Sequence, residues 1–71
     1  MKNIDNKPNL YVLRTARGWS QQYVANSAGI SRSYYSILET YGRAPSVTVA
    51  QRLARALDFN WRMFFDLDSN D

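Results

Sequence analysis

The chain has 71 residues, of which 45% are hydrophobic and ten are aromatic, which is enough for the core of one small domain. It contains neither Cys nor His, so disulfides and the usual zinc ligands are excluded, and the side chains that enzymes most often use as base or nucleophile are missing. The net charge is +3 and is unevenly placed, because residues 1–55 hold eight Lys or Arg against two acids, whereas residues 56–71 hold one Arg against four Asp. A basic body of this kind suits a polyanion such as nucleic acid, although many basic domains bind none.

No stretch of about 18 apolar residues exists that would span a membrane, and the N-terminus lacks the apolar stretch of a secretory signal. We therefore expect a cytoplasmic protein without membrane contact, and no metal, cofactor or small-molecule site is evident. Residues 1–71 are predicted to form a single domain, with an ordered core from about residue 7 to about residue 67 and short flexible ends.

The chain shows helical periodicity rather than the alternation of strands, and Gly, Pro, Ser and Asn residues divide it into short helical segments. In chain order, helices are expected from Pro8 to just before Gly18, from Gln21 to Ser27, from Arg32 to about Thr40, from Val47 to Leu57 and from Trp61 to about Leu67.

A residue that suits an N-cap is expected before each of these segments. The expected caps are Asn6 or Lys7, Ser20, Ser31, Ser46 and Asn60. Gly18 and Gly29 close the first two helices, and residues 41–45 form a loop. The sequence therefore predicts an all-α, compact five-helix domain.

Residues 21–40 carry the most informative pattern, two short helices joined by a tight turn. Where two such helices cross at roughly 90–120°, the first helix needs a small side chain, which Ala25 supplies. The turn needs a positive φ, which Gly29 adopts without steric cost. The pattern thus predicts that the second and third helices of the chain form a helix-turn-helix. The third helix then presents its outer face to a DNA major groove. The remaining positions able to pack inside are Val24, Ala28, Ile30, Tyr35 and Leu38.

Several motifs, in order and at similar spacing, resemble the Cro and phage-repressor family, also called Xre-like, across residues 9–66. The residues that carry this resemblance are Leu13-Arg14, Gly18-Trp19-Ser20-Gln21, Val24-Ala25, Gly29-Ile30-Ser31, Leu38-Glu39, Arg43, Pro45-Ser46 and Leu53-Ala54-Arg55-Ala56-Leu57.

This resemblance implies a five-helix regulator of transcription that usually binds a two-fold operator as a dimer. It implies that Gln21 contacts a phosphate and braces the recognition helix, and that Arg43 lies in a loop that contacts the DNA backbone. It also implies a partly buried structural ion pair between Arg14 and Glu39, which joins the first helix to the end of the third.

Two positions depart from the family pattern. Tyr41 stands where the family usually has Gly, which leaves the path of the following loop and its phosphate contacts open. Ile37 stands where the family often has a polar residue facing DNA. An exposed Ile could touch a thymine methyl group, or it could be a semi-exposed packing residue.

The outer face of the third helix holds the candidate DNA contacts. Arg32 either chelates guanine O6 and N7 or holds a phosphate without reading sequence. Ser36 faces a base edge, a phosphate or nothing, and Tyr34 either reaches a phosphate or packs against the second helix. Arg52 and Arg55 of the fourth helix are interpreted as surface charges. The predicted DNA-binding residues are Gln21, Ser31, Arg32, Ser33, Tyr34, Ser36, Ile37, Thr40 and Arg43.

A cluster of large apolar residues follows the fourth helix and exceeds what one short helix can bury. Phe59, Trp61 and Phe64 are expected to complete the core. Met63 or Phe65 is expected to stay exposed and to contribute to a homodimer contact.

These features together predict a sequence-specific regulator, a repressor that binds double-stranded DNA as a homodimer and occludes a promoter. The alternative is a protein-interaction module of the same fold, such as an antitoxin, with a toxin or an anti-repressor as its partner. An enzyme is disfavoured, because His and Cys are missing and no Gly-rich phosphate loop is present.

Overall fold

A computed structural model describes residues 8–65, which form four α-helices and one short 3-10 helix. No strand occurs between residues 8 and 65, so the predicted all-α class is confirmed. None of the helices in this range combines the length and the hydropathy that a membrane span requires. The elements are α1 (Leu10–Ala16), α2 (Gln21–Ala28), α3 (Arg32–Tyr41), α4 (Val47–Leu57) and the 3-10 helix η1 (Trp61–Phe64).

The fifth predicted helix is represented in the described part of the chain by η1 alone. Its backbone bonds join Met63 N–H to the Asn60 carbonyl and Phe65 N–H to the Arg62 carbonyl, both at 3.0 Å and both over three residues, which is the 3-10 pattern. A count of five α-helices is therefore not confirmed. The expected continuation to Leu67, the expected core limits at residues 7 and 67 and the acidic tail lie outside the described residues.

Serine side chains cap α2, α3 and α4, as the sequence predicts. The hydroxyls of Ser20, Ser31 and Ser46 each accept a hydrogen bond from the backbone N–H three residues further on, at 3.0–3.2 Å. Asn60 caps η1 through its Oδ1, which accepts a hydrogen bond from the Arg62 N–H, two residues further on, at 3.0 Å. These bonds satisfy N–H groups that have no partner inside their own helix.

The predicted cap of the first helix, Asn6 or Lys7, is wrong. Asn9 is the N-cap, and its Oδ1 accepts a hydrogen bond from the Val12 N–H at 3.0 Å. Pro8 precedes the cap instead of opening the helix. The reason is that Asn is among the strongest N-caps and here directly precedes Leu10, the first buried residue of α1.

Left-handed residues end the three longer helices. Gly29 and Gly42 follow α2 and α3 with φ of +71° and +65°. Asp58 follows α4 with φ of +59°, and it is the one non-glycine residue of positive φ among residues 8–65. Asp is one of the few non-glycine residues that adopt this conformation, because its short polar side chain can form local hydrogen bonds.

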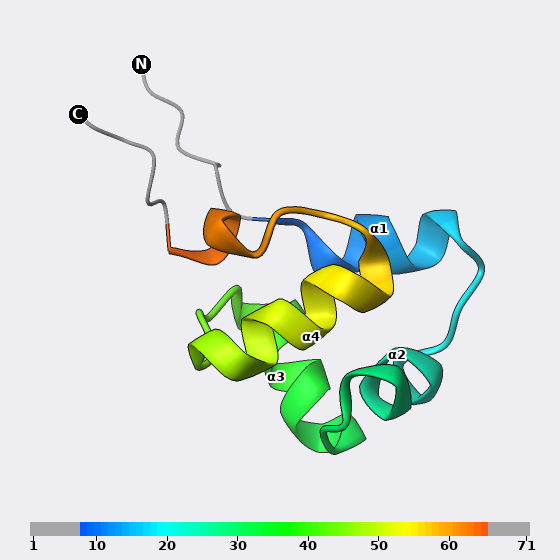
Figure 1. Cartoon of the computed structure of the whole chain (residues 1–71). Helices are drawn as coiled ribbons and strands as arrows, with labels where there is room; N and C mark the ends of the chain where they lie inside the picture. The colour runs from blue at the N-terminus through cyan, green and yellow to red at the C-terminus, as the bar shows by residue number, and fades with distance from the viewer. Residues whose placement is uncertain (1–7, 66–71) are drawn as a thin grey trace.

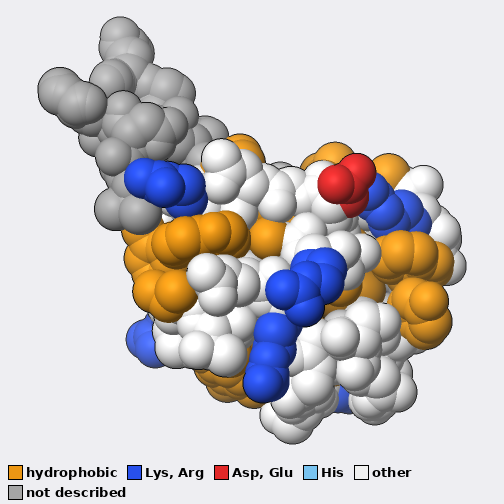
Figure 2. Space-filling model, in the orientation of Figure 1, with side chains coloured by type: hydrophobic (Ala, Val, Ile, Leu, Met, Phe, Trp, Pro, Cys, Tyr) orange, Lys and Arg blue, Asp and Glu red, His pale blue; other side chains and the backbone are white. Residues whose placement is uncertain are grey.

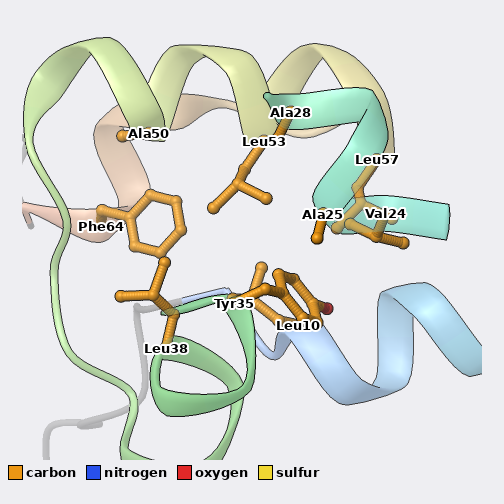
Figure 3. Packing of buried hydrophobic residues seen from close by; sticks show 10 residues of the cluster. All are labelled: Leu10, Val24, Ala25, Ala28, Tyr35, Leu38, Ala50, Leu53, Leu57 and Phe64. Carbon is orange, nitrogen blue, oxygen red and sulfur yellow. The ribbon is translucent and has the colours of Figure 1, made fainter. Parts of the chain in front are cut away.

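The core lies between α2, α3 and α4 and is completed by α1 and η1 (Figure 3). Its largest fully buried side chains are those of Tyr35, Leu53, Leu57 and Val24. α4 contributes four buried residues at helical spacing, whereas α1 contributes only Leu10. Burial of each large apolar side chain stabilises the fold by about 1.5–3 kcal/mol.

The helices surround this core so that one side of α3 is left open. Figure 1 shows α4 crossing the middle of the domain, with α1 above it and with α2 and α3 below. α4 packs against α2 and η1, and α3 packs against α2 and α1.

Candidate nucleic-acid interface

α2, a three-residue connection and α3 form the helix-turn-helix that the sequence predicts. Ala25 is fully buried, as a small residue at a helix crossing should be. Gly29 takes the positive φ expected of the turn, and the N–H of Ile30 closes the end of α2 by binding the Ala25 carbonyl at 3.0 Å. The predicted roles of Ala25 and Gly29 are confirmed.

α3 has a buried side and an open side. Tyr35 and Leu38 are 0% and 2% exposed and belong to the core. Ser36 and Tyr34 are half-buried, and Tyr34 packs against the core cluster. The structure thus brings most of the predicted contact residues together on one side of a single helix. The exposed ones are Ser31, Arg32, Ser33, Ile37 and Thr40.

The N-terminal end of α3 combines a capping hydroxyl with a free cation. The Ser31 oxygen accepts the Tyr34 N–H at 3.0 Å, and its own O–H proton stays available for donation. Arg32 is exposed and forms no ion pair or hydrogen bond with another residue of the range 8–65. Its guanidinium is therefore available to an external acceptor.

Glu39, near the end of α3, accepts hydrogen bonds from α1 and from α2. Arg14 donates from Nε to Oε1 at 3.1 Å and from Nη2 to Oε2 at 2.8 Å, the two-point pairing that suits a guanidinium and a carboxylate. Gln21 donates from Nε2 to Oε1 at 3.2 Å. Arg14 also donates from Nη1 to the Trp19 carbonyl at 2.8 Å. This network links α1, the start of α2 and α3, and it holds the Gln21 side chain against α3.

The network keeps both charges ionised. Burial of the carboxylate opposes ionisation, but the hydrogen bonds from Arg14 and Gln21 and the charge of Arg14 outweigh it, so the pKa of Glu39 lies below its ordinary value of 4.5. The hydrogen bond to Glu39 raises the pKa of Arg14. The two side chains are only 13% and 5% exposed, so water screens their attraction weakly.

The Tyr35 hydroxyl is buried close to this pair. It has no hydrogen-bond partner among residues 8–65, which is uncommon for a buried polar atom. Burial, followed by the negative charge of Glu39, raises the pKa of Tyr35. Tyr35 therefore contributes its ring to the core, while its hydroxyl adds no bond that meets normal geometry.

Tyr41, which stands where the family usually has Gly, extends α3 by one residue beyond the predicted end at about Thr40. Tyr41 is helical and 72% exposed. Gly42 then takes the left-handed conformation, and its N–H binds the Leu38 carbonyl at 3.0 Å. The glycine that ends the helix thus lies one position later than in the family pattern. The loop that follows presents Arg43 to solvent and buries Pro45.

Arg52 of α4 lies beside the turn of the helix-turn-helix, a position that sequence reasoning missed. One of its guanidinium nitrogens, Nη1, is 3.3 Å from the place that a Cβ would take at Gly29. The periodicity of α4 does identify Arg52 as exposed. It carries no information on which helix Arg52 faces, because that depends on how α4 packs on α2.

Charge on the described surface is almost entirely positive. Asp58 is the one exposed acid in residues 8–65, since Glu39 is largely buried. Figure 2 shows one face of the domain, on which basic side chains are spread widely and acidic atoms occupy a single small area. Such a surface attracts polyanions. The exposed cations are Arg17, Arg32, Arg43, Arg52, Arg55 and Arg62.

The apolar cluster after α4 divides as expected between core and surface. Phe64 is 3% exposed, and Phe59 and Trp61 are half-buried against the core. Met63 is 38% exposed. Phe65 is half-buried and contacts the Trp61 ring edge-on, with centroids 6.0 Å apart.

Comparisons with known proteins agree with this geometry. The family described as Helix-turn-helix matches residues 10–64, which span α1 to η1. A curated relative, the uncharacterized HTH-type transcriptional regulator YqaF from Bacillus subtilis (strain 168), is 40% identical over 53 residues, which are 75% of this chain and 70% of the relative. Among solved structures, the restriction-modification controller protein C.AhdI from Aeromonas hydrophila is 40% identical with a TM-score of 0.69, and the match covers 80% of this chain and 86% of that one.

Proposed function

The chain belongs to the Cro and phage-repressor (Xre-like) helix-turn-helix family of DNA-binding transcriptional regulators, and we propose that it is a repressor that binds a two-fold symmetric operator as a homodimer. α3 enters the major groove of each half-site. The bound dimer covers a promoter and so denies it to RNA polymerase.

The observation that carries this proposal is the open side of α3. Arg32, Ser33 and Thr40 are exposed along it, while the opposite side of the same helix is buried. The major groove is about 12 Å wide and admits one α-helix, with its N-terminal residues at the base edges. Arg32 stands at that end, and it has the geometry to bind guanine O6 and N7 in a bidentate manner.

Three other groups hold the DNA backbone in this proposal. The first turn of α2 offers free N–H groups to a phosphate. The side chain of Gln21, the first residue of that turn, is held in place by its hydrogen bond to Glu39. Arg43 reaches a second phosphate from the loop after α3. The O–H of Ser31 donates to a third. These contacts set the position of α3 and carry no sequence information themselves.

The homodimer contact is assigned to Met63 and Phe65. Between the end of α4 and residue 65, Met63 is the most exposed apolar side chain, and Phe65 is half-buried. Exposed apolar surface at one end of a small domain is typical of an interface. A symmetric pair of domains would place its two recognition helices about 34–36 Å apart, one turn of DNA.

Selection of bound sites from random duplex DNA tests the proposal. We expect a two-fold symmetric motif, and an affinity whose logarithm falls by about 0.9 per neutralised phosphate for each tenfold rise in salt. A motif without symmetry would overturn the dimeric arrangement. Absence of DNA binding by the chain, together with a complex with a co-encoded protein, would favour an antitoxin or another protein-interaction module instead.

Matched arginine variants separate base contacts from phosphate contacts. Arg32→Ala should relax the preference at one symmetric pair of positions, at a cost of about 1–3 kcal/mol. Arg43→Ala should weaken binding evenly across sequences and reduce the salt slope by about two, because each protomer of the dimer loses one phosphate contact. Arg55→Ala removes an exposed arginine on α4, outside the helix-turn-helix and outside the segment of Met63 and Phe65, and serves as the control for general charge.

A further inference from the structure

The open side of α3 changes character after its first residue. Beyond Arg32 it presents hydroxyl and apolar side chains, with no charged residue and no amide as far as Tyr41. Ile37 is 43% exposed on this side, and Tyr41, one turn further, is 72% exposed. These residues lie at the i, i+4 spacing that aligns side chains along one edge of a helix.

This composition restricts what α3 can read directly. Asn and Gln, which read adenine in a bidentate manner, and the acids that read cytosine do not occur on the open side, whereas the hydroxyl groups of Ser33, Ser36 and Thr40 bond to several bases and discriminate little among them. The C5-methyl group of thymine is read by apolar contact, and Ile37 offers a larger aliphatic side chain for it than the methyl group of Thr40 does. A hydrocarbon that stays in water in the free protein would become buried in the complex, and this favours binding.

Ile37 is five positions after Arg32, which corresponds to about 7.5 Å along the helix axis and to a rotation of about 140° around it. Both side chains are exposed, with Arg32 at one edge of the open side and Ile37 toward the other. The two side chains therefore face different bases of the same half-site.

We infer that Ile37 is a specificity-determining residue that recognises the methyl group of thymine, so that each half-site contains a thymine facing Ile37 as well as a guanine facing Arg32. The inference rests on the proposed DNA binding and adds the base chemistry of the operator to it. An extended positive surface favours DNA over a protein as the occupant of this face, because Asp58 is the one exposed acid in residues 8–65.

Replacement of thymine by uracil tests the inference, because it removes the methyl group and nothing else. In the duplex obtained by selection, each thymine of a half-site is replaced singly, and the Kd is measured by fluorescence anisotropy. Loss of one buried methyl group should weaken binding of the unaltered protein about fourfold at one thymine. The variant Ile37→Ser should bind the thymine and uracil duplexes equally.

Val47→Ser is the matched control. Val47 is 49% exposed, close to the exposure of Ile37, but lies at the start of α4. This variant should retain the fourfold preference for thymine. Both substituted positions are exposed, so both variants should keep the far-ultraviolet circular dichroism of the unaltered protein.

The outcomes separate the inference from the function on which it rests. Specific binding without any effect of uracil, or with an equal effect in Ile37→Ser, would overturn the methyl contact and leave the regulator intact. Failure to bind any duplex would overturn both. If Ile37→Ser left DNA affinity unchanged and disrupted a complex with a protein, the exposed side of α3 would be a protein-binding surface and the inference would be wrong.

Discussion

Arg14 in α1 and Glu39 in α3 are joined by two parallel hydrogen bonds of 3.1 and 2.8 Å, although 25 positions separate them in the chain. The same carboxylate binds Gln21. One side chain therefore connects the three helices that position the DNA-facing residues, and its loss would affect both stability and the placement of Gln21.

Removal of either partner of this pair should destabilise the fold. Fully buried pairs cost about 3–5 kcal/mol when one partner is removed, and we expect about 2–3 kcal/mol here because the Arg14 side chain keeps 13% of its exposure. Urea denaturation of Arg14→Gln, Glu39→Gln and the double variant measures this. The double variant should cost less than the sum of the two single ones. Additive costs would contradict a direct interaction.

The free energy of unfolding should fall in acid partly through Glu39. Because the folded pKa of Glu39 lies below its ordinary value of 4.5, the unfolded chain binds the proton more readily. The contribution is complete above pH 4.5, and it is lost as the pH falls through the lower folded pKa. Denaturation measured from pH 7 downward should therefore show a steeper decline below pH 4.5 for the unaltered protein than for Glu39→Gln. Equal slopes would show that Glu39 is not stabilised as an ion.

Replacement of Tyr35 by Phe should leave stability unchanged or raise it by up to about 1 kcal/mol. The ring stays in the core, while a buried hydroxyl without a hydrogen-bond partner is removed. Thermal or urea denaturation measures the change, and Tyr34→Phe, which alters a half-buried neighbour, is the control. A loss of more than about 1 kcal/mol would show that the hydroxyl is bonded in solution.

Alanine at Gly29 should destabilise the fold by about 1–2 kcal/mol, because φ is +71° there. Gly18 has the same φ and no atom within 4 Å of a new Cβ, so Gly18→Ala measures the backbone strain alone. At Gly29 the new Cβ meets only the flexible end of Arg52, at 3.3 Å. The two variants should therefore cost the same within about 0.5 kcal/mol. A larger cost at Gly29 that disappears in an Arg52→Ala background would contradict this.

Local signals in the sequence were sufficient for most of the fold. Ser20, Ser31, Ser46 and Asn60 each cap the helix that follows, because capping depends only on the next few residues. The bounds of α4 agree fully with the prediction, since its apolar spacing is regular. The first cap was missed because Pro8 suits a first helical turn, which placed the expected cap at Asn6 or Lys7 instead of at Asn9.

Features that depend on tertiary packing were less accessible. The position of Arg52 beside Gly29 and the unpaired hydroxyl of Tyr35 follow from how helices pack, which periodicity does not report. The bond between Gln21 and Glu39 corresponds to the bracing role that the family resemblance implied. The length of α3 was set by Gly42, which accepts a left-handed conformation more readily than Tyr41 does.

The attachment of α1 has a consequence for motion within the folded state. This helix fully buries one side chain, Leu10, where α4 buries four. The half-buried Leu13 also packs against the core, and the polar bonds of Arg14 add to the attachment of α1. Segments with few buried apolar contacts open locally at a lower free energy than the whole protein unfolds. Amide protons of α1 would thus exchange with solvent earlier than those of α2 and α4. Each such opening withdraws Arg14 from Glu39, so fluctuation of the first helix reaches the recognition helix without disrupting the apolar core.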